Sequence, residues 1–382
     1  MKHLLPVILI LLMAGAGCRS TQKAFQRGNY EKAVFNSIER LRRSPNNVKS
    51  RETLREAYPA MVDYINDRVI SAKQSPDPFK WESIMRYYRT LNRAYDELQR
   101  APAALEVVYD PRNYETEYNQ AVYNAADARY AVARQDLDRG KAGDRESAKN
   151  AYRNFERALA IRPNFKDAID LKAEALDYAT LIIQIEPIPM HSQSLALTNE
   201  FFENQLYEYI ASAGFNQFIL FVSGKESEVA RRNPDQVIQM VFDEFQVGDA
   251  FVKETVFNRK KDSVVVGQVE VNDSLYDAYG TVEAEVHSFT KTITSDGLLD
   301  LRIIDNRTGA ILSQRKFPGS YAWTDSWGYY KGDDKALSEE DEKICSKDKE
   351  SPNPDAQFLF VEFTKPIFTQ VTSFVKEYYR SY

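Results

Sequence analysis

Cysteine and histidine, the side chains that most often form metal sites and nucleophiles, are scarce in this chain of 382 residues, which holds two Cys and three His. His3, His191 and His287 stand apart, and no CxxC or HExxH motif occurs, so the sequence has no zinc-hydrolase pattern. The motifs GxSxG, GxxxxGK and GxGxxG are also absent, which removes the usual nucleophile-elbow and nucleotide-binding chemistries. We therefore expect no catalytic residue, metal or cofactor. Paired carboxylates of a sugar hydrolase have no fixed linear spacing, so an unrecognised hydrolase stays as an alternative.

Long apolar runs are equally rare. The main one covers residues 4–13, and no later run approaches twenty residues, which argues against a polytopic membrane protein. A ten-residue helix rises only about 15 Å, half of the roughly 30 Å of a bilayer's hydrocarbon core, so this run is too short for a lasting span. It follows Lys2 and ends in small residues before Cys18, which is the pattern of a secretion signal over residues 1–17.

The end of that signal resembles the lipobox of bacterial lipoproteins, with Gly15-Ala16-Gly17-Cys18. The family usually carries Leu where this chain has Gly15. The resemblance implies that the Cys18 sulfur receives a diacylglyceryl group and becomes the mature N-terminus; an ordinary signal cut after Ala16 is the alternative. Buried acyl chains contribute about 0.8 kcal/mol per CH₂, so two chains would anchor the protein permanently. The residues after Cys18 are not acidic, which implies the outer membrane of a Gram-negative bacterium, on its periplasmic face.

Charge is distributed unevenly. The formal net charge is −6, which gives no support to nucleic-acid binding. Residues 19–60 hold ten Lys or Arg against four Glu, while residues 61–382 are strongly acidic. A basic segment next to a lipid anchor could rest on anionic headgroups, at about 1 kcal/mol per cation. An equally good interpretation is that these basic side chains lie on solvent-exposed faces of helices.

Residues 18–180 are predicted to form an irregular array of antiparallel helices. The segment 28–33, followed by Pro45, and a later small-aromatic-small-Pro pattern resemble tetratricopeptide repeats. That later pattern consists of Ala151, Phe155, Ala158, Leu159 and Pro163. Between the two segments, six apolar residues recur at helical spacing and predict a buried stripe: Trp81, Ile84, Tyr88, Leu91, Tyr95 and Leu98. The resemblance implies a concave surface that holds another protein.

Residues 181–382 are predicted to form an α/β or α+β domain, because the pattern changes to alternation. We expect helices at 197–212 and 359–378, and a tight turn at Asn306-Arg307-Thr308-Gly309. Residues 333–355 hold nine carboxylates and are expected to form a solvated charged loop. The expected strands begin at residue 181 and continue at 217–222, 236–247, 264–271, 280–293, 298–305 and 311–317.

The segment 299–305 (LDLRIID), with Thr308-Gly309 and residues 311–312, resembles the strand-turn-strand core of a bacterial lipoprotein family. That family includes the curli secretion lipoprotein and the lipoprotein activators of peptidoglycan synthases. The resemblance implies a homo-oligomeric component of a secretion or cell-wall assembly machine. Because the family contains a pore-former, we considered a membrane-spanning hairpin. Residues 265–271 offer one apolar face, but 282–290 are not apolar enough, so an ordinary half-buried sheet is favoured.

A cluster of aromatic residues lies beside Gly319 and Gly328: Tyr321, Trp323, Trp327, Tyr329 and Tyr330. Such a cluster suits contact with a protein or a glycan when exposed, and its alternative role is to cover the sheet. The sequence as a whole predicts a membrane-anchored envelope lipoprotein that binds other envelope proteins as a scaffold or assembly factor.

Overall fold

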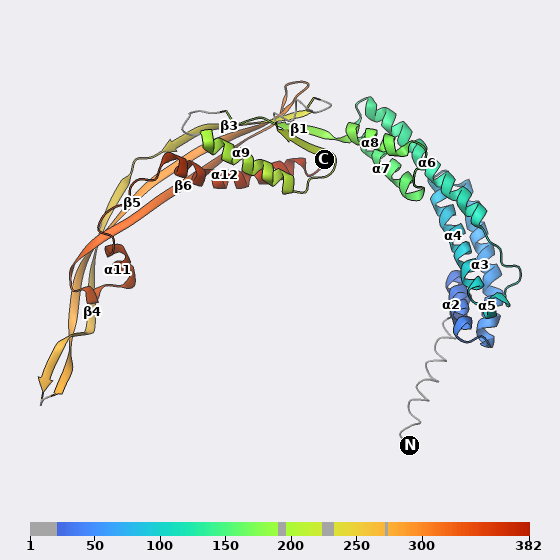
Figure 1. The fold of residues 1–382 in the computed structure, drawn as a ribbon, viewed down its shortest axis with the longest axis horizontal. Coiled ribbons are helices and arrows are strands. Elements are labelled where there is room, and N and C mark those ends of the chain that lie inside the picture. Colours follow the sequence, from blue (N-terminus) through green and yellow to red (C-terminus); the bar gives the residue numbers. More distant parts are fainter. Residues whose placement is uncertain (1–20, 190–195, 224–232, 272–273) are drawn as a thin grey trace, which may run out of the picture. The chain divides into compact units, whose positions relative to one another are not determined.

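The computed structural model describes residues 21–189, 196–223, 233–271 and 274–382. The expected signal peptide, residues 1–17, and the lipid-attachment residue Cys18 lie outside them. The chain divides into two compact units, Met1–Ala179 and Thr180–Tyr382 (Figure 1). The first is helical where it is described, and the second combines a mixed sheet with helices, so the predicted α plus β class is confirmed.

Helices that follow one another along the chain pack together in the first unit. The buried stripe predicted before Pro102 is confirmed for Ile84, Tyr88, Leu91 and Leu98, which are buried, whereas Trp81 and Tyr95 are half-buried. Gly140 lets two helices approach, since a Cβ there would lie 2.8 Å from the Ala148 Cβ. The helices are α2 (Tyr30–Arg43), α3 (Val48–Gln74), α4 (Lys80–Gln99), α5 (Pro102–Leu105), α6 (Glu115–Lys141), α7 (Arg145–Ile161) and α8 (Ala168–Ala179).

The sheet of the second unit contains six described strands. Strand β1 pairs in parallel with β2 and β3, and the remaining pairs are antiparallel. β3 and β4 lie one after the other along the same edge of β5, whose other edge carries β6. The strands are β1 (Leu181–Ile185), β2 (Ile219–Ser223), β3 (Gln236–Val247), β4 (Phe251–Val271), β5 (Ser274–Asp305) and β6 (Ile311–Gly332).

Two helices, α9 (Ala196–Ser212) and α12 (Ala356–Tyr379), cover one face of this sheet (Figure 1). Their side chains Phe202 and Phe363 share a core with Leu301 of β5. Gly319 of β6 permits this packing, because a Cβ there would lie 2.4 Å from the Phe363 carbonyl oxygen. The tight turn predicted at 306–309 is confirmed, with Gly309 at a φ of 70°.

The strands predicted at 280–293 and 298–305 are in fact one strand, β5. The polar residues between them keep ladder partners on both sides, since Ser295 lies opposite Val247 and Tyr321. Its buried hydroxyl also donates to the Leu359 carbonyl oxygen of α12, at 3.4 Å. A polar residue with a hydrogen-bond partner can therefore continue a strand where the sequence pattern indicates a break.

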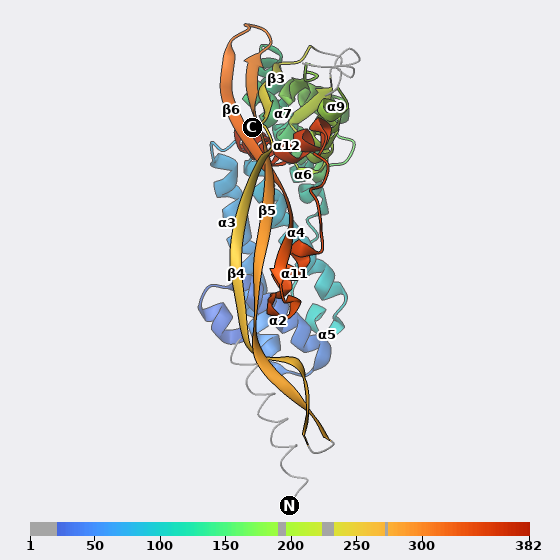
Figure 2. The same cartoon turned by 90° about the vertical axis from the view of Figure 1, so that its left-hand side faces the viewer.

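Strands β4, β5 and β6 extend beyond α9 and α12 as a long ribbon (Figures 1 and 2). β6 ends at Gly332 opposite Ala284, so beyond this point only β4 and β5 remain paired. We call this two-stranded end, residues 264–271 and 274–280, the hairpin tip. The prediction of a half-buried sheet is wrong for the tip, where Val269 is 53% exposed and Tyr276 60%. It holds for Val282, Ala284 and Val286, which are buried.

The segment 333–355, predicted as a solvated loop, is partly folded onto the ribbon. It contains a short 3-10 helix, η2 (Asp334–Ala336), and α11 (Glu339–Cys345). Ala336 and Leu337 are buried against the apolar residues of β5. Ser338 caps α11 and exchanges hydrogen bonds with Asp341. The many carboxylates of this segment predicted a solvated loop. The charge of Asp341 is instead balanced by an ion pair with Arg259, 82 residues earlier in the chain, which allows α11 to pack.

Candidate protein-binding surface

The five aromatic residues predicted as an interaction surface all lie on β6. Alternation along the strand places Tyr321, Trp323, Trp327 and Tyr329 on one face, which we call the aromatic face, and Tyr330 on the other. Tyr329 is 45% exposed, whereas the other three on its face are half-buried. The structure therefore joins four of the predicted residues and separates the fifth.

Two residues of β5 complete the aromatic face, and sequence reasoning missed them. Phe289 lies opposite Trp327, and the two rings stack with centroids 5.6 Å apart. His287 lies opposite Tyr329, with ring centroids 4.6 Å apart and planes within 12° of each other. Directly opposed side chains are the closest neighbours in a sheet, so these stacks follow from the strand register. No local sequence signal gives that register.

The end of the aromatic face near α12 is covered by the chain itself. Phe358 approaches the Tyr321 ring, with centroids 6.1 Å apart. Lys291 places its Nζ 5.9 Å from the Trp323 ring and donates to Glu350 and to the Ser351 carbonyl oxygen, both at 3.0 Å. Tyr321 and Lys291 therefore hold the 350–358 segment against the ribbon, with Trp323 beneath the Lys291 ammonium group. The open part of the aromatic face is formed by Trp327 and Tyr329 with their β5 partners.

His287 is fixed by two carboxylates on this open part. Its Nδ1 lies 2.8 Å from Glu254 Oε1 of β4, and its Nε2 lies 2.9 Å from Glu285 Oε1. Hydrogen bonds to Glu254 and then to Glu285 raise the pKa of His287 above its ordinary value. Both ring nitrogens donate only in the imidazolium form, so the two carboxylates favour a cation stacked on Tyr329.

The other face of the ribbon carries α11. Arg259 of β4 binds Asp341 through two hydrogen bonds, Nε to Oδ2 at 2.7 Å and Nη2 to Oδ1 at 2.8 Å. The Arg259 guanidinium, together with Ser338, holds the pKa of the Asp341 carboxyl well below its usual range. Gly328 also makes room for α11, because a Cβ there would lie 3.0 Å from the Ile344 Cγ2. Helix α11 thus fastens β4 to β6 at this point.

Beyond α11 the apolar residues of the ribbon continue without cover. Val266, Val269, Val271 and Tyr276 lie on the face that carries η2 and α11 further back, and each is about half exposed or more. The opposite face of the hairpin tip is mixed: Gln268 donates to Asp277 at 3.2 Å, and Leu275 and Tyr279 are each 66% exposed. β4 is also an edge strand of the described sheet. An exposed apolar face beside an open strand edge is the usual form of a protein interaction surface.

The described residues contain no group of three or more His, Cys, Asp or Glu arranged to hold a metal ion. Burial, and to a lesser degree the charge of Asp341, raises the pKa of the Cys345 thiol, so it stays protonated at neutral pH and is a poor nucleophile. Among the described helices, none combines the length and apolar character that a membrane span requires.

Comparisons with known proteins leave the family of the chain open. No family model matches it, and no curated protein does. The structure is similar to the crystal structure of a neuraminyllactose-binding hemagglutinin homolog from Helicobacter pylori, at 12% identity and a TM-score of 0.23. That alignment covers 53% of this chain and 90% of the other. So low a score supports no argument about fold or function.

Proposed function

We propose that this protein is an envelope lipoprotein, anchored through Cys18 to the outer membrane on its periplasmic face, that binds other envelope proteins through its ribbon. It binds and does not catalyse. The observation that carries the proposal is the uncovered apolar face of the hairpin tip, next to the open edge of β4. The first unit acts as a helical, tetratricopeptide-like scaffold in this proposal.

An apolar face and an open strand edge are unfavourable in water. A two-stranded hairpin is at best marginally stable alone, and natural proteins usually protect open edges with charge, proline or a covering element. Here α11 protects the ribbon only as far as Val282, and Val269 and Tyr276 remain in solvent. A partner that adds an extended segment to β4 would satisfy its free backbone groups and bury these side chains together. We therefore expect the partner to offer a strand with alternating apolar residues.

A matched pair of variants tests the ribbon. Val269→Lys places a charge on the apolar face, and Gln268→Lys places the same charge on the opposite face of the same strand. We expect the full-length protein, and the Gln268→Lys variant, to retain the same defined envelope protein in a pull-down, and Val269→Lys to lose it. Equal retention by both variants, or no specific protein retained by any of them, would contradict the proposal.

The anchor is tested separately by membrane fractionation. The Cys18→Ser variant cannot receive a diacylglyceryl group, so we expect it to leave the membrane fraction. Mass spectrometry of the mature N-terminus should find a lipid-modified Cys18 in the parent protein. If Cys18→Ser stays with the membranes as before, the anchor is elsewhere.

A second candidate function is a homo-oligomeric component of a secretion or cell-wall assembly machine. The open edge of β4 favours it, because two copies could pair these edges. Sedimentation of the solubilised protein at micromolar concentration should then reveal an oligomer. A monomer under those conditions removes this candidate and leaves the first one standing.

A further inference from the structure

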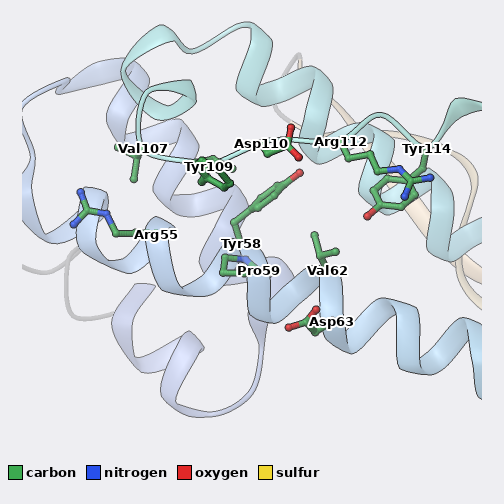
Figure 3. A pocket seen from close by; sticks show the side chains of 11 residues that line it. Arg55, Tyr58, Pro59, Val62, Asp63, Val107, Tyr109, Asp110, Arg112 and Tyr114 are labelled. Atoms are coloured by element: carbon green, nitrogen blue, oxygen red, sulfur yellow. The ribbon is translucent and has the colours of Figure 1, made fainter.

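The helical unit contains a cavity of about 380 Å³ between α3 and the segment 107–114 that follows α5 (Figure 3). This volume lies at the lower end of the range in which proteins hold small molecules. Pro59 and Val62 of α3, with Val107 and Val108 opposite, make an apolar lining. Charged and hydroxyl side chains surround it. The cavity lies in the first unit and has no part in the ribbon.

Helix α3 arranges its lining residues by polarity. Arg55, Pro59 and Asp63 recur every four residues and so lie on one face of the helix. Eight residues separate the cation from the carboxylate, which corresponds to about 12 Å along the axis. Figure 3 shows Arg55 on one side of Pro59 and Asp63 on the other. This wall of the cavity therefore has a positive end, an apolar middle and a negative end.

The opposite wall is held in place by the helical core. Tyr114 is buried, its backbone N–H donates to Asn92 Oδ1 at 2.7 Å, and its ring stacks on Tyr88. Asp110 lies in the left-handed region, with a φ of 47°. The neighbouring Tyr109 is 97% exposed, so an aromatic side chain stands in solvent beside the cavity. A wall so anchored preserves the shape of the cavity without a ligand.

Among the described residues, three of the four charged side chains around the cavity have no side-chain partner. Arg112 forms an ion pair with Glu117 and lies over the Tyr114 ring. Within the described residues, Arg55, Asp63 and Asp110 form no hydrogen bond or ion pair through their side chains. Arg55 can therefore bind an anionic group at one end of the α3 wall, and Asp63 can bind a cationic group at the other end.

Tyr58 adds a neutral polar group between these ends. Its side chain points from α3 toward the 107–114 segment (Figure 3). Burial, followed by the charges of Tyr114 and Asp110, raises the pKa of Tyr58 to about 12. The phenol therefore keeps its proton at neutral pH and can donate it in a hydrogen bond.

We propose that this cavity binds a short zwitterionic peptide of two or three residues, with its carboxylate at Arg55 and its ammonium at Asp63. Such a peptide extends about 7 to 11 Å, which with a hydrogen bond at each end suits the spacing of Arg55 and Asp63 along α3. A guanidinium binds a carboxylate with two parallel hydrogen bonds, so Arg55 sets the direction of the peptide. Its apolar side chains lie on Pro59 and Val62.

Calorimetric titration of the full chain in detergent with the peptide Ala-Val-Ala, its N-acetylated form and its C-amidated form tests the proposal. We expect saturable binding of the free peptide and at least tenfold weaker binding of each capped form. Equal binding of free and capped forms, or no saturable binding at millimolar peptide, would overturn the assignment.

Variants assign each end of the peptide. Asp63→Asn should abolish the preference for the free over the N-acetylated peptide and leave the response to amidation, and Arg55→Met should do the reverse. Asp67→Asn, one turn further along α3 and outside the cavity, removes the same charge and should change neither preference. Arg55 and Asp63 are exposed, so these variants should fold normally, which circular dichroism checks. If Asp67→Asn acts like Asp63→Asn, only the net charge matters and the site is wrong. Because the ribbon is not involved, failure here leaves the proposed function untouched.

Discussion

Arg259 and Asp341 join β4 to α11 through two hydrogen bonds across 82 residues of sequence. The Asp341 side chain is 3% exposed, whereas the Arg259 side chain is 35% exposed and stays partly hydrated. This ion pair helps to hold α11 on the ribbon, close to the point where the apolar face of β5 stops being covered.

Asp341→Asn should lower the free energy of unfolding by about 2 kcal/mol, because a buried charge-assisted pair is lost while Arg259 keeps its contact with water. The depressed pKa of Asp341 stabilises the fold above the ordinary carboxyl pKa of about 3.9, and this contribution disappears as the pH falls toward the folded pKa. Urea titrations across the acid range should therefore show a flatter pH dependence in Asp341→Asn. Asp348→Asn, in the same segment and exposed, is the control and should match the parent.

His287 gives a pH dependence of opposite sign. Its raised pKa means that the imidazolium stabilises the folded ribbon below the ordinary value of about 6.5, and that this stability is lost as the pH rises through the folded pKa. Hydrogen exchange of residues 285–289 should accelerate between mildly acidic and mildly basic pH, beyond the intrinsic increase. His287→Gln should remove that extra acceleration. If the variant keeps it, the Glu254 and Glu285 hydrogen bonds do not control the titration.

Gly319→Ala should be destabilising by about 1 to 3 kcal/mol or more, because its Cβ would overlap the Phe363 carbonyl oxygen and α12 would have to move. Gly267→Ala is the matched control. That glycine also lies in a strand, but no atom stands within 4 Å of the added Cβ. Thermal unfolding of the two variants should separate them clearly. Equal midpoints would mean that α12 does not pack on β6 as described.

Cys345 should react slowly with thiol reagents in the folded protein at neutral pH, because burial keeps its pKa above the ordinary value. In denaturant the same thiol should react at the rate of a free cysteine. The ratio of the two rates, measured by labelling and mass spectrometry, reports how firmly α11 is held. Asp341→Asn should raise the folded-state rate, since it loosens α11. Rapid labelling of the parent protein would contradict the packing of this helix.

The local sequence pattern was sufficient to predict those parts of the fold that depend on periodicity within a single helix or turn. The stripe from Ile84 to Leu98 is buried because helical spacing alone puts those residues on one side. The turn at Gly309 was also predictable from local sequence, because glycine adopts a positive φ more readily than other residues. Ser295 shows the opposite case, because its place within β5 depends on a hydrogen bond to α12.

The candidate surface was only half predictable. Alternation was enough to place Trp327 and Tyr329 on one strand face. Their partners Phe289 and His287 depend on the register between β5 and β6, which extends over 21 residue pairs. The cavity beside Tyr58 gave no signal at all, because its walls are separated by about fifty residues in sequence.

The amino-acid sequence by itself determined the periodicities, the composition of each half and the order of polar and apolar residues along β4, β5 and β6. Only the tertiary structure decided which apolar residues lose contact with water. Val286 is buried and Val269 is exposed because β6 ends, and α11 packs, between the two positions. The position of α11 in turn depends on contacts between distant residues, such as Arg259 and Asp341. Side-chain chemistry is local, whereas burial is a property of the assembled fold.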